Sequence, residues 1–119
     1  MATRRPVQRA PEAAQLSERT FDETVAASQG LLLVDFWADW SGPAHTIAPV
    51  LEDLAAASED RVTRAKVNVV ENAGLATRYG IRSVATILFV KEGPVADRVF
   101  GAVPKTVLRR HLDRASLLS

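Results

Sequence analysis

Apolar runs typical of β-strands occupy four parts of the chain. Leu31–Trp37 reads LLLVDFW, an almost continuous apolar run that is typical of a strand buried on both faces of a sheet. The stretch 62–69 alternates or runs apolar and predicts a second strand. Segments 86–91 and 95–100 flank Glu92-Gly93-Pro94, and this pattern predicts an antiparallel hairpin.

Helices are predicted in segments that precede, separate and follow these strands. Thr20 with Glu23 fits a capping box at the start of a first helix, and Gly30 can close that helix in a left-handed conformation. Apolar positions at helical spacing predict further helices over 43–57, 73–79 and 104–115. The order α, β, α, β, α, β, β, α predicts an α/β fold, with a central mixed β-sheet flanked by helices on both faces.

The length of 119 residues corresponds to one domain. We expect this domain to span 16–119, after a disordered basic extension over 1–15 that carries Arg4, Arg5 and Arg9. An electrostatic tether to an acidic partner is the alternative interpretation of the extension. The extension lacks the apolar stretch that a secretory signal requires, so we expect no signal peptide.

Charge and residue counts exclude several classes of function. The formal net charge is +1, so no whole-molecule field favours nucleic acid or an anionic membrane as partner. No apolar run approaches the roughly 18 residues that a membrane span requires. Cysteine is absent from the whole sequence, which excludes disulfides, cysteine-ligated metals and a thiol nucleophile. His45 and His111 are far apart in sequence, and we expect no metal site.

Several segments together carry a family resemblance. Residues 34–44 read VDFWADWSGPA, and this stretch resembles the active-site segment of thioredoxins, whose core is Trp-Cys-Gly-Pro-Cys. The segments AKVN at 65–68 and YGIR at 79–82, with Gly93 and Gly101, are similar to later thioredoxin segments. The resemblance covers roughly 16–112 and implies the thioredoxin fold and a parent activity of protein-disulfide reduction. It also implies a cytoplasmic monomer without a cofactor, whose partners are thioredoxin reductase and disulfide-containing client proteins.

Three departures from the family pattern remove this chemistry. Ser41 and Ala44 stand at the positions of the two redox cysteines, and Ala85 stands at the position of a cis-proline. Disulfide exchange requires a thiolate to attack and a second thiol to resolve the mixed disulfide. A serine hydroxyl stays protonated at neutral pH and forms no disulfide, so we expect the chain to be redox-inactive. Because a cis bond before a non-proline residue costs about 2.5–4 kcal/mol, we expect a trans Val84–Ala85 bond.

Asp35 is anomalous because it lies inside an apolar strand. Burial disfavours the charged form, so the pKa of its carboxyl group should be raised. The resemblance implies that Asp35 and Lys66 are the family's proton-transfer pair, which would act on the resolving thiol. A plain buried salt bridge between the two is the alternative.

The resemblance also implies a surface that receives substrate polypeptide, partly by backbone pairing. Its residues in this chain are Trp40, Gly42, Pro43, Val84, Ala85 and Gly101.

Two interpretations account for a thioredoxin without cysteines. The losses are confined to the two thiols and the cis-proline, and each replacement is a small residue, while Asp35, Lys66 and Trp40 remain. This pattern favours an engineered protein with its catalytic positions substituted. The alternative is a natural, non-catalytic module that keeps the fold in order to bind proteins.

Overall fold

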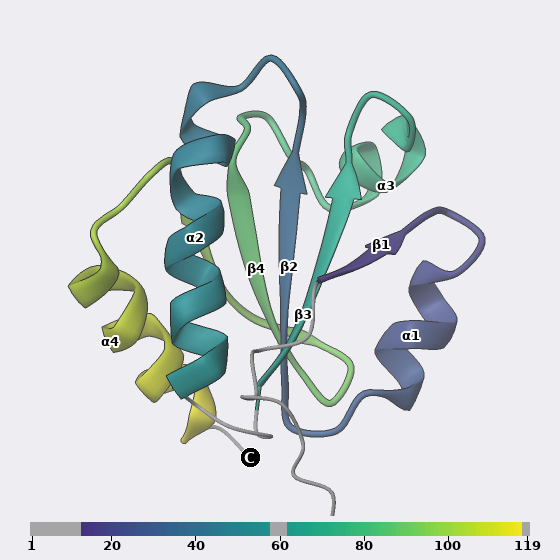
Figure 1. The fold of residues 1–119 in the computed structure, drawn as a ribbon. Coiled ribbons are helices and arrows are strands. Elements are labelled where there is room, and N and C mark those ends of the chain that lie inside the picture. The colour runs from purple at the N-terminus through teal and green to yellow at the C-terminus, as the bar shows by residue number, and fades with distance from the viewer. Residues whose placement is uncertain (1–12, 58–61, 118–119) are drawn as a thin grey trace, which may run out of the picture.

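The structure is a computed structural model that describes residues 13–57 and 62–117. The elements along these residues are β1 (Ala14–Leu16), α1 (Phe21–Ala27), β2 (Leu31–Trp37), α2 (Gly42–Ala57), β3 (Val62–Asn68), α3 (Ala73–Arg78), β4 (Thr86–Lys91), β5 (Val95–Phe100) and α4 (Lys105–Ser116). Within the described ranges, the strands form one sheet in the order β1-β3-β2-β4-β5 (Figure 1).

The sheet is mixed, with β2 at its centre. Strand β2 pairs parallel with β3 and antiparallel with β4, and every residue of LLLVDFW except Trp37 is buried. Helices α2 and α4 cover one face of the sheet, and α1 and α3 cover the other (Figure 1). This arrangement confirms the predicted α/β fold class with helices on both faces.

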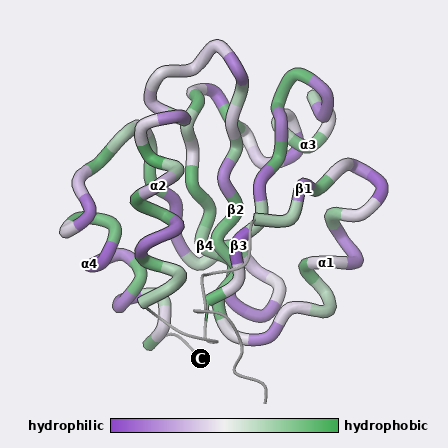
Figure 2. Tube along the Cα trace, viewed as in Figure 1, coloured by the Kyte–Doolittle hydropathy of each residue, from purple (hydrophilic) through white to green (hydrophobic). Residues whose placement is uncertain are grey.

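The two faces of β2 bury different side chains because successive residues of a strand point to opposite sides. Leu31 and Leu33 pack with Ile47 of α2 and Leu108 of α4. Leu32, Val34 and Phe36 pack on the opposite face with Phe21 of α1 and Leu75 of α3. Figure 2 shows hydrophobic colouring concentrated in the central strands and mixed with hydrophilic colouring along α2 and α4. Asp35, from the odd-numbered set, therefore faces α2.

Most element boundaries agree with the sequence prediction, and one element was not predicted. Strand β1 pairs parallel with β3, and it includes Ala14 and Gln15, which the sequence pattern had placed in the disordered extension. Three residues are too few for the alternation pattern to register, so only the pairing with β3 makes this strand recognisable. The remainder of the expected extension, residues 1–12, lies outside the described residues.

The predicted capping box at Thr20 is wrong. The Thr20 side chain makes no hydrogen bond to the backbone of α1; instead, its hydroxyl oxygen accepts a hydrogen bond from the Ser17 N–H at 3.0 Å. Gly30 has a φ of 73°, as its predicted left-handed conformation requires. It lies in the turn before β2, however, because α1 ends earlier, with Ser28 as its C-cap.

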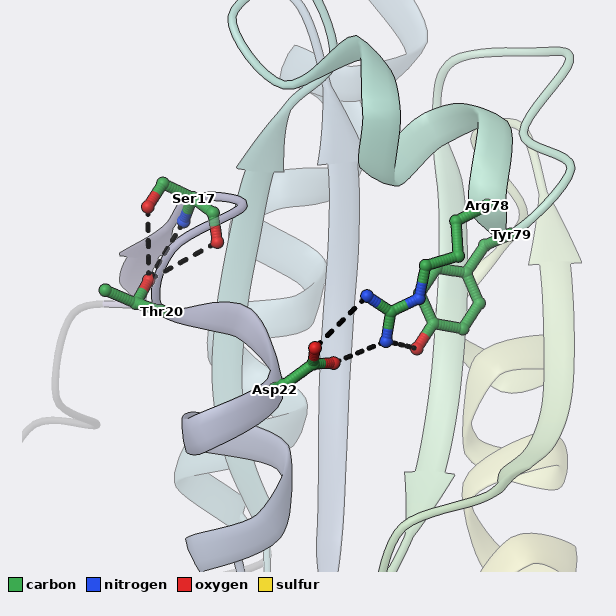
Figure 3. A network of polar contacts seen from close by, with 5 residues as sticks. All are labelled: Ser17, Thr20, Asp22, Arg78 and Tyr79. Atoms are coloured by element: carbon green, nitrogen blue, oxygen red, sulfur yellow. Dashed lines mark hydrogen bonds and ion pairs between the residues drawn. The ribbon is translucent and has the colours of Figure 1, made fainter.

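A polar network joins α1 to α3 on the far side of the sheet from α2. Arg78 donates hydrogen bonds to both carboxylate oxygens of Asp22 and to the Tyr79 hydroxyl (Figure 3). The Arg78 guanidinium also lies 5.7 Å from the centre of the Phe21 ring. These contacts fasten the two short helices to each other. Along the described part of the chain, no helix is both long and apolar enough to cross a membrane.

Candidate functional site

The candidate site lies where β2 ends and α2 begins. The chain leaves β2 at Trp37, and α2 starts at Gly42, so Ser41 is the residue that precedes the helix. The Ser41 Oγ accepts a hydrogen bond from the Ala44 N–H at 3.2 Å, which satisfies one of the free backbone donors in the first turn. Ser41 is therefore the N-cap of α2.

The Ser41 hydroxyl also connects α2 to the loop before β4. It donates a hydrogen bond to the Val84 carbonyl oxygen at 3.1 Å, and Ser41 is only 3% exposed. Ala44 is buried beside it in the first turn of the helix. The two residues at the expected cysteine positions thus lie together, and the one hydroxyl between them is buried and hydrogen-bonded.

The expectation of a trans Val84–Ala85 bond is wrong, because this peptide bond is cis. The carbonyl groups of Val84 and Ala85 both accept hydrogen bonds from residues that are distant in sequence. Val84 accepts the bond from Ser41, and the Ala85 carbonyl oxygen accepts a hydrogen bond from the Gly101 N–H at 2.8 Å. The expectation of a trans bond rested on the intrinsic preference of an isolated peptide bond, and that preference takes no account of such tertiary contacts.

The residues of the expected polypeptide-binding surface are brought together by these same bonds. Trp40 is 70% exposed, and Gly42 and Pro43 are exposed next to it in sequence. The Ser41–Val84 bond brings the half-buried Val84 beside this segment, and the Gly101–Ala85 bond adds the end of β5. Phe100, which the sequence analysis did not single out, is 52% exposed at that end of β5. The sequence could have indicated Phe100, because it is an aromatic residue directly before Gly101, which was expected at the binding surface.

Asp35 is 4% exposed in the middle of β2. Burial raises the pKa of its carboxyl group to about 6, while the positive charges of Arg64 and then Lys66 act in the opposite direction. Its Oδ1 has no hydrogen-bond partner within the described residues. The direction of this pKa shift is the one that the sequence predicted.

Lys66 lies opposite Asp35 in the register of β2 and β3. The structure contains no ion pair between them among the described residues. The Lys66 ammonium instead lies 5.2 Å from the centre of the Trp37 ring. Arg64, two residues earlier on the same face of β3, was not singled out from the sequence, although its spacing from Lys66 would have indicated it.

The two histidines lie in separate places with separate partners. The His45 Nε2 is 2.8 Å from the Asp39 carbonyl oxygen, and the His111 Nδ1 is 2.6 Å from an Asp97 carboxylate oxygen. Over the ranges 13–57 and 62–117, no three side chains of the kinds that bind metal ions gather into a group.

This arrangement lacks the groups that disulfide exchange requires. The whole sequence contains no thiol, and the Ser41 hydroxyl already donates to a carbonyl group. A nucleophilic serine also requires a base within hydrogen-bond reach, whereas the nearby His45 ring bonds to the Asp39 backbone. What the site offers to a ligand is an exposed indole ring and the surface around Val84.

Comparison with known proteins places these observations in a family. The thioredoxin family model matches residues 12–114. The chain is 45% identical over 102 residues to thioredoxin 1 of Synechococcus elongatus, covering 86% of this chain and 95% of that protein. It is 46% identical over 94 residues to the thioredoxin of Rhodospirillum rubrum, covering 79% of this chain and 90% of that protein. A chloroplastic M-type thioredoxin of Pisum sativum is 41% identical over 99 residues, covering 83% of this chain and 58% of that protein.

Proposed function

This chain belongs to the thioredoxin family, and from that premise we propose that it is a redox-inactive member that binds polypeptides without exchanging disulfides. One observation carries the proposal. Ser41 and Ala44 occupy the cysteine positions and are buried, while Trp40 directly beside them is 70% exposed. The reactive groups are gone, and the surface next to them still faces solvent.

The proposed binding surface consists of Trp40, Gly42, Pro43, Val84 and Gly101, and Ala85, the sixth residue expected there, is buried next to Val84. Large exposed aromatic side chains are typical of polypeptide-binding sites. Asp35 and Lys66 are, in this proposal, the proton-transfer pair of the parent activity, retained without a thiol on which to act.

The proposed partners are thioredoxin reductase and disulfide-containing client proteins, bound without turnover. The proposed location is the cytoplasm, and the proposed state is a monomer. Family membership supports the proposed partners.

For the origin of the substitutions we propose deliberate replacement at Ser41, Ala44 and Ala85. Serine is nearly isosteric with cysteine, and alanine is a minimal truncation. The buried Asp35 is unfavourable when ionised, yet it remains beside Arg64 and Lys66. A chain that had drifted freely after loss of function would have been expected to lose this residue.

The second candidate is a natural binding module that abandoned redox chemistry. One observation favours it: the Ser41 hydroxyl makes two hydrogen bonds, to the Ala44 N–H and to the Val84 carbonyl. Serine is a strongly preferred N-cap residue, so selection for stability can retain it at this position. The two candidates differ in whether the rest of the site still supports catalysis.

Restoring the chemistry tests this difference. In the Ser41→Cys, Ala44→Cys, Ala85→Pro variant, the first thiolate would attack a client disulfide, releasing one client thiol and forming a mixed disulfide. The second thiol would then displace the other client sulfur. We expect the triple variant to reduce insulin disulfides with thioredoxin reductase and NADPH at a rate ordinary for the family.

The matched control is Ser41→Cys with Ala85→Pro and Ala44 unchanged. It should accumulate the mixed disulfide without turnover, because the second thiol is missing. A triple variant that folds, as judged by circular dichroism, but neither turns over nor accepts electrons would reject the silenced-thioredoxin proposal. The binding-module candidate would then replace it.

The binding surface is tested without any thiol. The unmodified chain should bind a reduced, unfolded client polypeptide measurably in a pull-down with purified components. Trp40→Ala should weaken this binding by about tenfold, a typical loss for a central aromatic contact. Leu117, which is exposed and directly follows α4, supplies the control Leu117→Ala. Equal binding by both variants would contradict a role for the Trp40 surface.

A further inference from the structure

A polar groove lies between α2 and the β1–β3 side of the sheet, apart from the surface around Trp40. It has a volume of about 310 Å³ and is lined by Ala13, Ala48, Pro49, Glu52, Arg64 and Lys66. Its wall is the middle of α2, and its floor is β3 with the residue that precedes β1. The groove shares no residue with the proposed polypeptide-binding surface.

Two cations without carboxylate partners face this groove. Arg64 and Lys66 are half-buried, and within the described residues neither makes an ion pair. Other cations among the described residues do form ion pairs: Arg78 pairs with Asp22, and Lys105 pairs with Asp53. Partial desolvation of a charge is unfavourable unless an opposite charge compensates for it, and for Arg64 and Lys66 the buried Asp35 compensates only through space, without an ion pair.

The charge around the groove is predominantly positive, with one exception at its rim. Among the described residues, the only acid that lines it is Glu52, which is exposed on α2 and forms no ion pair with either cation. The other nearby acid, Asp35, is buried behind the cations, and both lower the pKa of its carboxyl group against the effect of burial. Asp35 therefore interacts electrostatically with both cations, although it forms no ion pair with either in the described structure.

The basic segment of the sequence starts at the mouth of this groove. Ala13 is one of the lining residues, and the twelve residues before it contain Arg4, Arg5, Arg9 and a single acid, Glu12. Three further positive charges are therefore tethered within twelve residues of the groove. Charges at that range attract an oppositely charged partner before any direct contact forms.

The spacing of the two cations indicates the shape of the partner. Arg64 and Lys66 are alternate residues of one strand, so their side chains leave the same face about 6.6–6.8 Å apart. An extended polypeptide with acids at alternate positions repeats at the same distance. Within the described residues, strand β1 is also at the edge of the sheet, so an extended segment has a strand edge beside which to lie.

We propose that this groove is a docking site for an extended acidic segment of a partner polypeptide, with alternate carboxylates bound by Arg64 and Lys66. The basic residues before Ala13 add long-range attraction for the same segment. The inference is independent of the Trp40 surface and of any redox activity.

The test measures binding of two fluorescein-labelled peptides to the full chain by fluorescence anisotropy at low ionic strength. The peptides have the same composition, and glutamates occupy alternate positions in one and a contiguous block in the other. We expect the alternating peptide to bind more tightly, and its affinity to fall as salt is added, because salt screens exposed charges.

Variants separate a specific site from a general charge effect. Arg64→Gln with Lys66→Gln should weaken binding by about tenfold or more, as expected for loss of two charge contacts. The control, Arg109→Gln with Arg110→Gln, removes the same charge from the exposed surface of α4 and should change binding by less than about twofold. Glu52→Gln should tighten binding by about twofold to threefold, since it removes the repulsive charge. This last variant leaves both cations in place, so it remains informative if the double variant fails to fold.

Several results would overturn the proposal. Equal weakening by the two double variants would mean that only net charge matters. Equal affinity for the two peptides would remove the strand-spacing argument. Displacement of the peptide by millimolar inorganic phosphate would indicate a simple anion site, and tighter binding of a single-stranded oligonucleotide would indicate a nucleic-acid site. Deleting residues 2–12 should weaken binding several-fold at low salt only; unchanged affinity would exclude a role for that segment.

Discussion

Ser41 has a structural role in this protein. A nucleophile at this position must be accessible, whereas the Ser41 side chain is buried, caps α2 and donates to the Val84 carbonyl. A hydroxyl group suits these contacts better than a thiol, because S–H is a weak donor and sulfur a weak acceptor. The serine at this position therefore fastens α2 to the loop before β4.

Replacing Ser41 with alanine should reveal this contribution. Ser41→Ala removes the cap and the bond to Val84, and we expect the free energy of unfolding to fall by about 1–2 kcal/mol. Urea denaturation measures the change. Thr46→Ala, at an exposed position in the same helix, should be neutral or slightly stabilising, because alanine has the higher helix propensity. A Ser41→Ala variant as stable as the unmodified chain would show that the hydroxyl has no structural role.

At the scale of elements, the short helix α3 depends on contacts from the β1–α1 connection. The Glu18 carboxylate accepts a hydrogen bond from the Gly74 N–H at 2.6 Å, and the Glu18 N–H donates to the Asn72 Oδ1 at 3.1 Å. Because α3 spans only Ala73–Arg78, it is too short to be stable alone. Glu18 at one end and the Asp22–Arg78 pair at the other hold it against α1.

Gly74 and Glu18 should therefore be energetically coupled. A Cβ atom at Gly74 would clash with the Glu18 Oε2, so Gly74→Ala must displace the carboxylate and break its hydrogen bond. We expect Gly74→Ala to give no gain in the unmodified chain. With Glu18→Ala already present, the same change should stabilise by about 0.5–1 kcal/mol, the usual benefit of alanine over glycine in a helix.

A double-mutant cycle measures this coupling from the unfolding free energies of the four proteins. Equal effects of Gly74→Ala with and without Glu18 would mean that the side chain moves aside without loss. The helix would then be held by its packing alone.

At the scale of the whole molecule, two acids act on stability in opposite directions. Burial raises the pKa of Asp35 from 3.8 to about 6. Partial burial tends to raise the pKa of the Asp97 carboxyl group. The hydrogen bonds with His111 and with the Arg98 N–H outweigh this effect and hold the pKa below its ordinary value. The folded state therefore keeps a proton on Asp35, and loses one from Asp97, more readily than the unfolded chain does.

These shifts predict a stability maximum on the acid side of neutrality. A group whose pKa is raised on folding stabilises the protein fully at pH values below its unfolded-state pKa, and this stabilisation is lost as the pH rises through the folded-state pKa. The stabilisation by Asp35 is therefore lost between pH 3.8 and about 6. The loss should be about 2–3 kcal/mol, given 1.36 kcal/mol per pKa unit. The Asp97 contribution is present above its unfolded value of 3.8 and is lost as pH falls below it.

Urea midpoints measured from pH 3 to 8 test this profile. Asp35→Asn should remove the decline between pH 4 and 6 and leave a protein more stable than the unmodified chain at pH 8. Asp39→Asn, at an exposed position near the same site, should retain the decline. A decline that persists in Asp35→Asn would assign it to another group.

The sequence by itself determined the architecture of this protein. The strand at Leu31–Trp37 and the hairpin over 86–100 are present as predicted. Burial of apolar side chains is the dominant favourable term in folding, and the order of apolar and polar residues in the sequence shows directly which segments can be buried. The absence of cysteine likewise excludes disulfide exchange whatever fold the chain adopts, because no other side chain can form a disulfide. The raised pKa of Asp35 followed from its place in an apolar strand.

Tertiary structure alone decided the features that depend on residues distant in sequence. Strand β1 exists through its pairing with β3, and the carbonyl groups of Val84 and Ala85 are held by Ser41 and Gly101. The Thr20 hydroxyl bonds to Ser17 instead of α1, and Lys66 lies over Trp37 instead of pairing with Asp35. Each outcome is a choice between competing polar partners of similar strength, and only the folded geometry determines which partner is within reach.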